Sequence, residues 1–565
     1  MKKLITLLLI LFISIQCKKI TTFKKTSYQG LIAEKAIVVS ARKEASKIGL
    51  QILKKGGNAF DAMIATEFAL AVAYPFAGNL GGGGFMVYRT KNGEIGALDY
   101  REKAPLLASK KMYLDKDQNI IKGKSTIGPL AIGVPGTVAG MFEVHKKFGS
   151  LPIEDIIQPV IDLAKKGVVV TKKQEKRLAS YLPSFKKTNK DSIPFFNVWK
   201  ENDTIKYQNL AITFETILKN GVEEFYKGET AKKLVKFIQK EGGIITLEDL
   251  NKYKAVWREP IVFNYDNLKV ISMSPPSSGG ICLAQIMNSL EPFDLHNYKH
   301  NSTKTIQLIT EASRRAYADR SYFLGDPDFV KIPIDTLIDK NYSKKRMESF
   351  SFEKATLSST VSHGNIQIVE SNETTHYSII DQFGNAISAT TTLNGGYGSK
   401  LYCNELGFFL NNEMDDFSSK PGEPNMFGLI GAEANSIAPE KRMLSSMTPT
   451  IIEKNNKLYM SLGTPGGSTI ITSVLQTILN VHEFNMGMQQ AVDQPRFHHQ
   501  WLPDVIKMEP NKFDSITKNN LLNLGYNLDE TNSPIIGKVN GILVLENKKL
   551  EAGADKRGDD EAVGF

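Results

Sequence analysis

Cysteine is scarce in this sequence, because the 565 residues contain only three, at positions 17, 282 and 403. A fold that depends on several disulfides is therefore excluded. If Cys17 lies in a targeting segment, Cys282 and Cys403 could form at most one disulfide, and the sequence leaves open whether they pair. Long apolar runs are also absent after the first 16 residues, so we expect no transmembrane helix in the rest of the chain.

The composition also lacks the biases that mark non-globular chains. With 41% hydrophobic residues, 23% charged residues and 44 glycines, the chain is neither disordered, collagen-like nor a coiled coil. We find no internal repeat and no low-complexity linker. The length fits three or four domains, or one large α/β unit that takes up the whole chain.

The charge distribution gives no indication of nucleic-acid binding. The net charge is +10, and the basic residues are mixed with acidic ones and form no long run. The two parts of the chain nevertheless differ in sign: residues 1–373 carry 55 basic and 38 acidic side chains, and residues 374–565 carry 15 and 22. Net charges of +17 and −7 are compatible with two fragments that associate, although screening leaves most of the adhesion to burial.

The first residues have the pattern of an export signal. Lys2 and Lys3 precede the apolar run Leu4–Ile15, which is too short to span a bilayer comfortably. The run ends at Cys17 in a loose lipoprotein box, so we predict a signal peptide over 1–16 and a lipidated Cys17. An ordinary signal peptide cut a few residues later is the alternative. Either way we expect an exported bacterial protein, periplasmic or anchored in the membrane as a lipoprotein.

Hydrophobic periodicity predicts a mixture of helices and strands. The β-branched segments Tyr377–Ile380 and Ala386–Thr392, joined by a turn with Gly384-Asn385, predict a β-hairpin. Amphipathic helices with solvated polar faces are expected at Val160–Lys166 and Thr305–Asp319. The other predicted strands are Val38–Ser40, Phe85–Arg89, Thr450–Ile452 and Leu458–Leu462, and the other predicted helices are Ala45–Leu53, Ala59–Val72 and Ser473–Val481.

One string of residues at the start of the hairpin carries chemical information. Thr374-Thr375-His376-Tyr377-Ser378 resembles the processing site of γ-glutamyltransferases (γ-glutamyl transpeptidases), and the resemblance covers most of the chain after the signal. Each supporting motif is weak alone, but their order and spacing are specific. They are Gly56-Gly57-Asn58-Ala59, Gly78-Asn79-Leu80 with Gly81–Gly84, Asp99-Tyr100-Arg101-Glu102, Gly133-Val134-Pro135-Gly136, Pro275-Pro276-Ser277-Ser278-Gly279-Gly280, Ala318-Asp319-Arg320 with Gly325-Asp326-Pro327, Asn412-Glu413-Met414-Asp415-Asp416-Phe417, Leu444-Ser445-Ser446-Met447 and Gly463-Thr464-Pro465-Gly466-Gly467-Ser468.

The resemblance implies an α/β (α+β) fold, the four-layer αββα sandwich of the N-terminal nucleophile hydrolases. It also implies a precursor that cuts itself between Glu373 and Thr374. The products would be a large subunit, 17–373, and a small catalytic subunit, 374–565, which form one intertwined heterodimer. The chemistry is reasonable, because cleavage creates an α-amino group with a pKa of about 7.7–8.0 beside the Thr374 hydroxyl, and this amine can act as its base.

The resemblance assigns roles to further residues. Thr392 matches the threonine that hydrogen-bonds the nucleophile, although an isolated pair of threonines would normally be ordinary strand residues. Arg101 would bind the substrate α-carboxylate, with help from Ser445 and Ser446, while Asn394, Glu413 and Asp416 would bind its α-ammonium group. Without the motifs, Arg101 would be interpreted as a surface ion pair, and Asp415 or Asp416 as a turn carboxylate.

Two glycine-rich segments have different interpretations. Gly466 and Gly467 match the pair whose N–H groups stabilise the tetrahedral oxyanion. Gly81–Gly84 lacks the residues of a phosphate loop and is interpreted as a structural turn. The adjacent histidines 498 and 499 would point to opposite faces of a strand, so we predict no metal site and no cofactor.

The segment Lys420–Ala432 resembles the lid loop of family members that act on small γ-glutamyl compounds such as glutathione, with Phe427 where some relatives have Tyr. We therefore expect an enzyme that forms a γ-glutamyl-threonyl ester and passes the group to water, an amino acid or a dipeptide. The alternatives are an acylase acting on other amides, such as a glutaryl-cephalosporin, and a catalytically silent, lipid-anchored binding protein. The Arg101 and Asp416 pair favours a free amino-acid head group over the acylase.

Overall fold

Two seven-stranded antiparallel sheets lie at the centre of the computed structural model, which describes residues 29–363, 375–426, 428–532 and 535–565. The first sheet has the order β1 (Ile32–Ala33), β20 (Leu550–Ala554), β19 (Asn540–Val544), β15 (Lys457–Gly463), β14 (Thr450–Lys454), β9 (Leu268–Ser272) and β8 (Ile261–Tyr265). The second has the order β21 (Glu561–Gly564), β2 (Ile37–Ser40), β10 (Thr375–Ile380), β11 (Ala386–Thr392), β3 (Gly83–Arg89), β4 (Ile95–Asp99) and β7 (Val256–Arg258).

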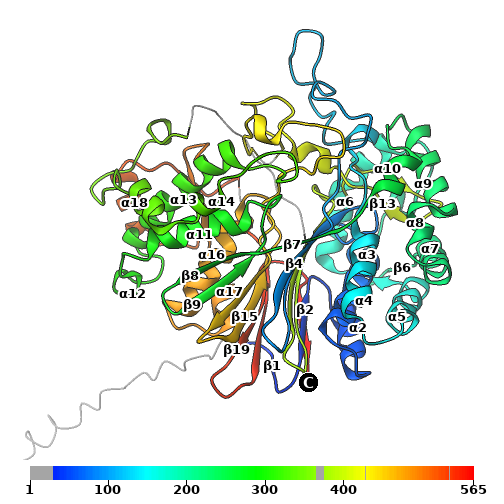
Figure 1. The fold of residues 1–565 in the computed structure, drawn as a ribbon, viewed down its shortest axis with the longest axis horizontal. Helices are drawn as coiled ribbons and strands as arrows, with labels where there is room; N and C mark the ends of the chain where they lie inside the picture. Colours follow the sequence, from blue (N-terminus) through cyan, green and yellow to red (C-terminus); the bar gives the residue numbers. More distant parts are fainter. Residues whose placement is uncertain (1–28, 364–374, 427, 533–534) are drawn as a thin grey trace, which may run out of the picture.

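Helices cover the outer face of each sheet, as Figure 1 shows. The helices beside the second sheet are α2 (Lys43–Lys54), α3 (Ala59–Ala73), α4 (Thr137–Phe148), α5 (Ile153–Lys166), α6 (Lys172–Thr188), α7 (Gln208–Asn220), α8 (Glu223–Tyr226), α9 (Glu229–Lys240) and α10 (Leu247–Lys252). Those beside the first sheet are α11 (Gly279–Leu290), α12 (Leu295–Tyr298), α13 (Thr303–Phe323), α14 (Ile334–Leu337), α15 (Lys340–Arg346), α16 (Thr469–His482), α17 (Met488–Asp493) and α18 (Ser515–Asn523). The predicted four-layer αββα sandwich is confirmed.

The alternation of side chains along the strands builds this sandwich. In β3, Phe85 and Val87 face the core between the sheets, whereas Met86 and Tyr88 belong to the core under the helices. The two sheets are also joined by hydrogen bonds, because Ser388 Oγ donates to the Leu462 carbonyl at 2.9 Å and Ser461 Oγ donates to the Ile387 carbonyl at 2.8 Å. The hairpin β10–β11 is therefore held rigidly on both faces.

Both sheets contain strands from before and from after position 374. In the second sheet, β10 pairs with β2 on one side, and β11 pairs with β3 on the other. In the first sheet, β14 pairs with β9. Because each part of the chain contributes strands to both sheets, neither part has a complete core of its own. Three smaller sheets pair β5 (Val168–Val169) with β6 (Thr204–Ile205), β12 (Tyr402–Cys403) with β13 (Phe408–Phe409), and β16 (Phe497–His498) with β17 (Ile506–Met508) and β18 (Leu528–Asp529).

The predicted elements are present, with longer bounds than the sequence indicated in most cases. The hairpin has the expected strands, and its turn is built by Asp381, whose carboxylate accepts the N–H groups of Phe383 and Asn385. Helix α3 begins at Asn58, whose side chain accepts the N–H groups of Phe60 and Asp61. Cys282 and Cys403 are both buried free thiols, so they form no disulfide with each other.

One prediction about a helix surface is wrong. The segment Thr305–Asp319 was expected to have a solvated polar face, but residues Thr305–Ser321 of α13 are all buried. Its charged residues compensate one another inside the protein: Glu311 accepts hydrogen bonds from both Arg314 and Arg315. Helix α13 is a central helix of its layer, packed against α11 and α18, and this position cannot be deduced from amphipathicity.

Candidate functional site

A small cavity brings together seven of the predicted site residues. Leu429, Met447 and Ile470 supply apolar wall. The seven predicted residues in the wall are Arg101, Asn394, Glu413, Asp416, Ser445, Ser446 and Gly467.

The Arg101 guanidinium lies at the centre of an acidic cluster. Nη1 donates to Glu413 and Nη2 donates to Asp416, while Nε donates to the Met443 carbonyl at 3.4 Å. The Glu102 carboxylate lies 3.8 Å from Nη1. The Arg101 side chain is only 1% exposed, so these contacts take place without bulk water. Arg101 therefore lines the cavity as a buried side chain and is not part of a surface ion pair.

Three carboxyl groups face this single guanidinium. Burial raises the pKa of Glu102 to about 7 and that of Glu413 well above its ordinary value, against the opposing effect of Arg101. Burial also raises the pKa of Asp416. Both oxygens of Glu102 and one of Glu413 have no hydrogen-bond donor among the described residues. A cluster with more carboxylates than cations and unsatisfied oxygens is suited to bind a further cation, such as an ammonium group.

The two serines present hydroxyl groups to the same cavity. Ser445 Oγ accepts the Met447 N–H at 3.1 Å, and Ser446 Oγ accepts from Arg320 Nη2 at 3.1 Å. Because each oxygen already accepts a hydrogen bond, each hydroxyl proton can be donated to an anion in the cavity. The serines thus form an anion-binding wall.

Thr392 and Asn394 follow each other where β11 ends. Thr392 Oγ1 accepts the backbone N–H of Asn394 at 2.6 Å, and the Asn394 side chain donates to the Asn412 carbonyl at 3.0 Å. Asn394 has φ of +70°, a conformation that Asn tolerates better than most residues. This turn directs the Asn394 amide to the cavity while Thr392 stays at the end of the strand.

Gly82 shows why the four-glycine segment is needed beside Thr392. A Cβ on Gly82 would lie 2.1 Å from the Thr392 carbonyl oxygen, which accepts from the Asn79 side chain at 2.8 Å. The segment therefore supports the end of β11, in agreement with a structural turn. Glu373 and Thr374 lie outside the described residues, and the structure begins again at Thr375, which pairs with Thr391.

Gly466 and Gly467 come directly before α16. Their φ values are +141° and +54°, which are strained for any residue with a Cβ. The helix begins at Thr469, and the Gly466 carbonyl accepts both the N–H and the hydroxyl group of this residue. The positive end of the α16 dipole thus lies next to the two glycines, in the place where a negative oxygen would be stabilised.

The described part of the expected lid loop closes one side of the cavity. Asn425 donates to Asp416 Oδ1 at 3.1 Å, and the Met426 N–H donates to Asp415 Oδ2 at 2.8 Å. Asp415 also accepts from Ser125, so it anchors the loop and does not line the cavity. Phe427 lies outside the described residues.

Some residues of the site were missed by sequence reasoning. Glu102 follows Arg101 in the same motif, but only the structure shows it against the guanidinium. Asn411 Oδ1 accepts the N–H groups of Glu413 and Gly133, and so joins two of the motifs. The loop Pro275–Ser278 clamps Ser445, because the Ser445 N–H donates to the Pro276 carbonyl, and Ser278 donates to the Ser445 carbonyl. Glu102 and Ser278 belong to the quoted motifs, which gave them no role, and Asn411 lies just before one of these motifs.

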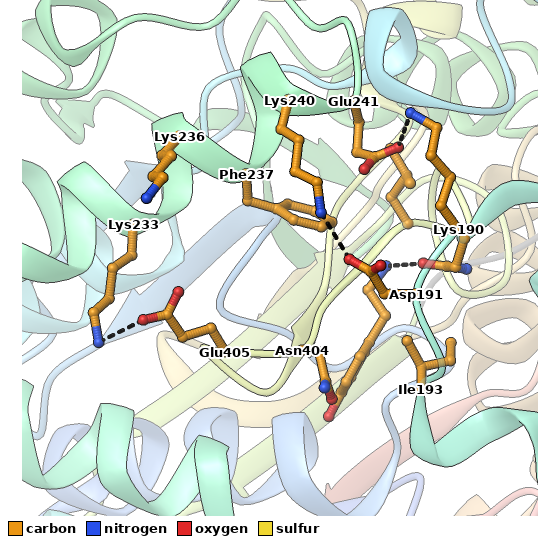
Figure 2. Close-up of a pocket in the computed structure, with 13 residues that line it drawn as sticks. Lys190, Asp191, Ile193, Lys233, Lys236, Phe237, Lys240, Glu241, Asn404 and Glu405 are labelled. Atoms are coloured by element: carbon orange, nitrogen blue, oxygen red, sulfur yellow. Dashed lines mark hydrogen bonds and ion pairs between the residues drawn. The ribbon is translucent and has the colours of Figure 1, made fainter.

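A larger cavity lies elsewhere, between α9 and the β12–β13 hairpin, and is shown in Figure 2. None of the predicted site residues lines it. Three of its lysines are neutralised by ion pairs of 2.8–2.9 Å with acidic residues, namely Lys190 with Glu241, Lys233 with Glu405 and Lys240 with Asp191. Its size alone therefore gives no reason to place the chemistry there.

The two adjacent histidines have structural contacts. His498 bonds Thr472 through Nδ1 at 2.8 Å, and His499 contacts Asp504 through Nε2 at 3.3 Å. Burial lowers the pKa of His498 to about 3 and that of His499 to about 4, so both are neutral. No group of three or more metal-ligating side chains occurs in the described ranges, and none of the helices there is long and apolar enough to cross a membrane.

Comparisons with known proteins find several that are similar to this chain. The family model described as gamma-glutamyltranspeptidase matches residues 45–565. The glutathione hydrolase proenzyme of Escherichia coli K12 is 44% identical over 540 residues, which cover 94% of this chain and 92% of that protein. The crystal structure of Helicobacter pylori gamma-glutamyltranspeptidase has a TM-score of 0.56 at 44% identity and covers 57% of this chain and 94% of that one. A cephalosporin acylase from Bacillus halodurans has a TM-score of 0.83 over 95% of this chain and 97% of its own, but at 24% identity it shows the fold alone.

Proposed function

The chain belongs to the γ-glutamyltranspeptidase family and is a self-processing γ-glutamyltransferase, and from this premise we propose that Thr374 is its nucleophile. The hydroxyl group of Thr374 would first attack the Glu373 carbonyl carbon. The Glu373 acyl group would move from the Thr374 nitrogen to the Thr374 hydroxyl oxygen, and water would then cleave the resulting ester. The new α-amino group of Thr374 would then serve as general base for the same hydroxyl group.

The position of the hairpin supports this assignment. Thr374 is bonded to Thr375, whose ladder partner Thr391 precedes Thr392. A nucleophile directly before β10 would act at the end of the hairpin where Thr392 lies and where Asn394 enters the cavity. Strands β10 and β11 are buried along their whole length, so the sheet gives the nucleophile a rigid support.

The cavity fits the two charged groups of a γ-glutamyl donor. Arg101, Ser445 and Ser446 would bind the α-carboxylate, while Asn394, Glu413 and Asp416 would bind the α-ammonium group. The guanidinium has five N–H donors, of which three are engaged by Met443, Glu413 and Asp416, so two are left for a substrate carboxylate. The three carboxyl groups around Arg101 are the observation that carries the assignment, because an ammonium group can take the place of the protons that burial otherwise favours on them.

Gly466 and Gly467 would stabilise the oxyanion that forms when Thr374 attacks the γ-carbonyl carbon. Their backbone lies at the positive end of α16, and Gly467 also lines the cavity. The resulting γ-glutamyl-threonyl ester would be resolved by water, or by the amine of an amino acid or dipeptide. Glutathione and related γ-glutamyl compounds are the donors, and we propose no cofactor.

The acylase alternative has less support from the site. A glutaryl group has a terminal carboxylate but no ammonium group, so Glu413 and Asp416 would lack a partner. A silent binding protein would require neither a self-cutting threonine nor glycines at a helix start with the φ values observed here.

The assembly and location of the protein are also proposals. Residues 17–373 and 374–565 would remain together as a heterodimer, because each contributes strands to both sheets. The predicted signal peptide, 1–16, and Cys17 lie outside the described residues. We propose export to the periplasm, with a lipid anchor on Cys17.

Thr374→Ala tests the nucleophile directly. We expect one uncut band on a denaturing gel and no release of p-nitroaniline from γ-glutamyl-p-nitroanilide. Thr375→Val is the matched control: it removes the neighbouring hydroxyl group, which has no hydrogen-bond partner among the described residues, and should still be cut. Normal processing of Thr374→Ala would contradict the assignment.

A further inference from the structure

Helix α13 contacts two walls of the donor cavity through side chains one turn apart. Tyr317 donates its hydroxyl proton to the Ser468 carbonyl, next to Gly467. Arg320 donates to Ser446, which belongs to the serine part of the cavity wall. Residues three apart project from the same side of a helix, so one buried helix holds both the oxyanion segment and the serine wall.

Arg320 makes two hydrogen bonds to this serine wall. Its Nη2 donates to Ser446 Oγ at 3.1 Å, and its Nε donates to Ser278 Oγ at 2.9 Å. Ser278 Oγ in turn donates to the Ser445 carbonyl at 2.7 Å. Arg320 is 3% exposed, so a fixed positive charge is connected to both serines of the cavity without bulk water between them.

These contacts determine which way the Ser446 proton points. A hydroxyl oxygen that accepts from a guanidinium keeps its proton for another acceptor, and Ser446 lines the cavity. The charge acts in the same direction, because the Arg320 guanidinium adds a positive charge behind the serines, whereas the Arg101 guanidinium is shared with three carboxyl groups. Burial raises the pKa of Asp416, and the charges of Arg101 and, to a smaller extent, Arg320 oppose this rise, so the field of Arg320 reaches the cavity.

We propose that Arg320 is a positioning residue for the α-carboxylate of the donor, which acts by orienting the Ser446 hydroxyl group and by placing a second positive charge behind the serine wall. The inference rests on the proposed function. It makes Arg320 a determinant of selectivity for donors that carry a carboxylate on the α-carbon, in addition to Arg101.

Two donors that differ only in this carboxylate test the proposal. γ-Glutamyl-p-nitroanilide has it, and 4-aminobutyryl-p-nitroanilide keeps the ammonium group but lacks it. For Arg320→Gln we expect kcat/KM with the γ-glutamyl donor to fall about tenfold or more, mainly through KM, as for the loss of a charge-assisted hydrogen bond. With the aminobutyryl donor, measured with enzyme in excess, the change should stay below about twofold.

Further variants keep the test valid if Arg320→Gln does not mature. Arg320→Lys keeps the charge but cannot reach Ser278 and Ser446 in the same fork, and Ser278→Ala removes one contact while keeping the arginine. Both should show a smaller loss that is again confined to the γ-glutamyl donor. Arg89→Gln is the matched control, because it breaks a buried ion pair, with Glu453, that lies outside the cavity. It should leave kcat/KM unchanged with both donors.

The outcomes separate the two proposals. If the wild-type protein releases no p-nitroaniline from the γ-glutamyl donor, the proposed function is wrong. If the wild type is active, two results would show that the positioning role is wrong. Either the Arg320 and Ser278 variants lose the same activity with both donors, or they lose activity with neither donor. Non-additive losses in Arg320→Gln with Ser446→Ala would support the role, and additive losses would contradict it.

Discussion

Replacing Arg101 by lysine separates charge from geometry at the donor site. The Arg101 guanidinium donates N–H groups to three different partners, namely Met443, Glu413 and Asp416. Lysine keeps the positive charge, but its three protons come from one atom and cannot span the same partners. The charge should still compensate the acidic cluster well enough for folding. Arg101→Ala would leave three buried carboxyl groups without a cation, at a cost of about 3–5 kcal/mol.

The magnitude follows from the number of donors. Of five N–H groups, three are used within the protein and two are left for the α-carboxylate. Lysine loses at least one contact to that carboxylate, because its protons are needed by Glu413 and Asp416. A hydrogen bond to a charged group contributes about 1.5–3 kcal/mol, so kcat/KM should fall by about 10- to 150-fold, mainly through KM.

The assay is the initial rate of p-nitroaniline release from γ-glutamyl-p-nitroanilide over a range of concentrations. A denaturing gel of the same sample checks that Arg101→Lys is still cut. Arg89→Lys is the control for an arginine-to-lysine change in a buried ion pair outside the cavity. An unchanged KM in mature Arg101→Lys would refute the reasoning, and a failure to mature would make Arg101 a folding residue.

Two further predictions concern other parts of the site and its support. Gly467→Ala should lower kcat by about 10²–10³-fold with little change in KM, since a Cβ is strained at its φ of +54° and the backbone would have to turn its N–H away from the oxyanion. Gly384→Ala, with φ of +95° at the hairpin turn, is the control, and equal losses in both would contradict an oxyanion role. Glu67 is fully buried and accepts a hydrogen bond from the Tyr377 hydroxyl at 2.6 Å, and burial raises its pKa from 4.5 to about 7. Its contribution to the free energy of unfolding is therefore complete below pH 4.5 and is lost as the pH rises through 7. That loss amounts to about 3 kcal/mol, or about 3 °C in Tm for a chain of this size. In thermal melts between pH 5 and pH 9, Glu67→Gln should no longer show this decrease of Tm with pH. An identical pH dependence of Tm in both proteins would show that Glu67 is not the titrating group.

Much of the fold could be predicted from local patterns. The hairpin was predictable because its two segments are β-branched and its turn contains Gly384 and Asn385, both of which are local properties. Helix α3 was predictable because Asn58 is a strong N-cap before an alanine-rich segment. The buried state of α13 was not, because its charged residues are compensated by partners on the same helix and by distant residues such as Asp504.

The candidate site, like the fold, could be predicted from the sequence only in part. The motifs pointed to the residues of the cavity, but they gave no distances and left the roles of Glu102, Ser278 and Arg320 unassigned. Glu102 is adjacent to Arg101 in the chain, yet its carboxylate is important only because burial removes the water that would otherwise solvate it. Arg320 is more than one hundred residues from Ser446, and no local pattern relates them.

By itself, the amino-acid sequence determined six of the strands, five of the helices, the family resemblance and the types of side chain that the chemistry needs, because these depend on residues close together in the chain or on their order. The tertiary structure alone decided that Arg101 is surrounded by three carboxyl groups, that Gly466 and Gly467 lie at the start of α16, and that α13 supports both walls of the cavity. These properties depend on burial and on contacts between distant segments, which exist only after the two sheets have packed together.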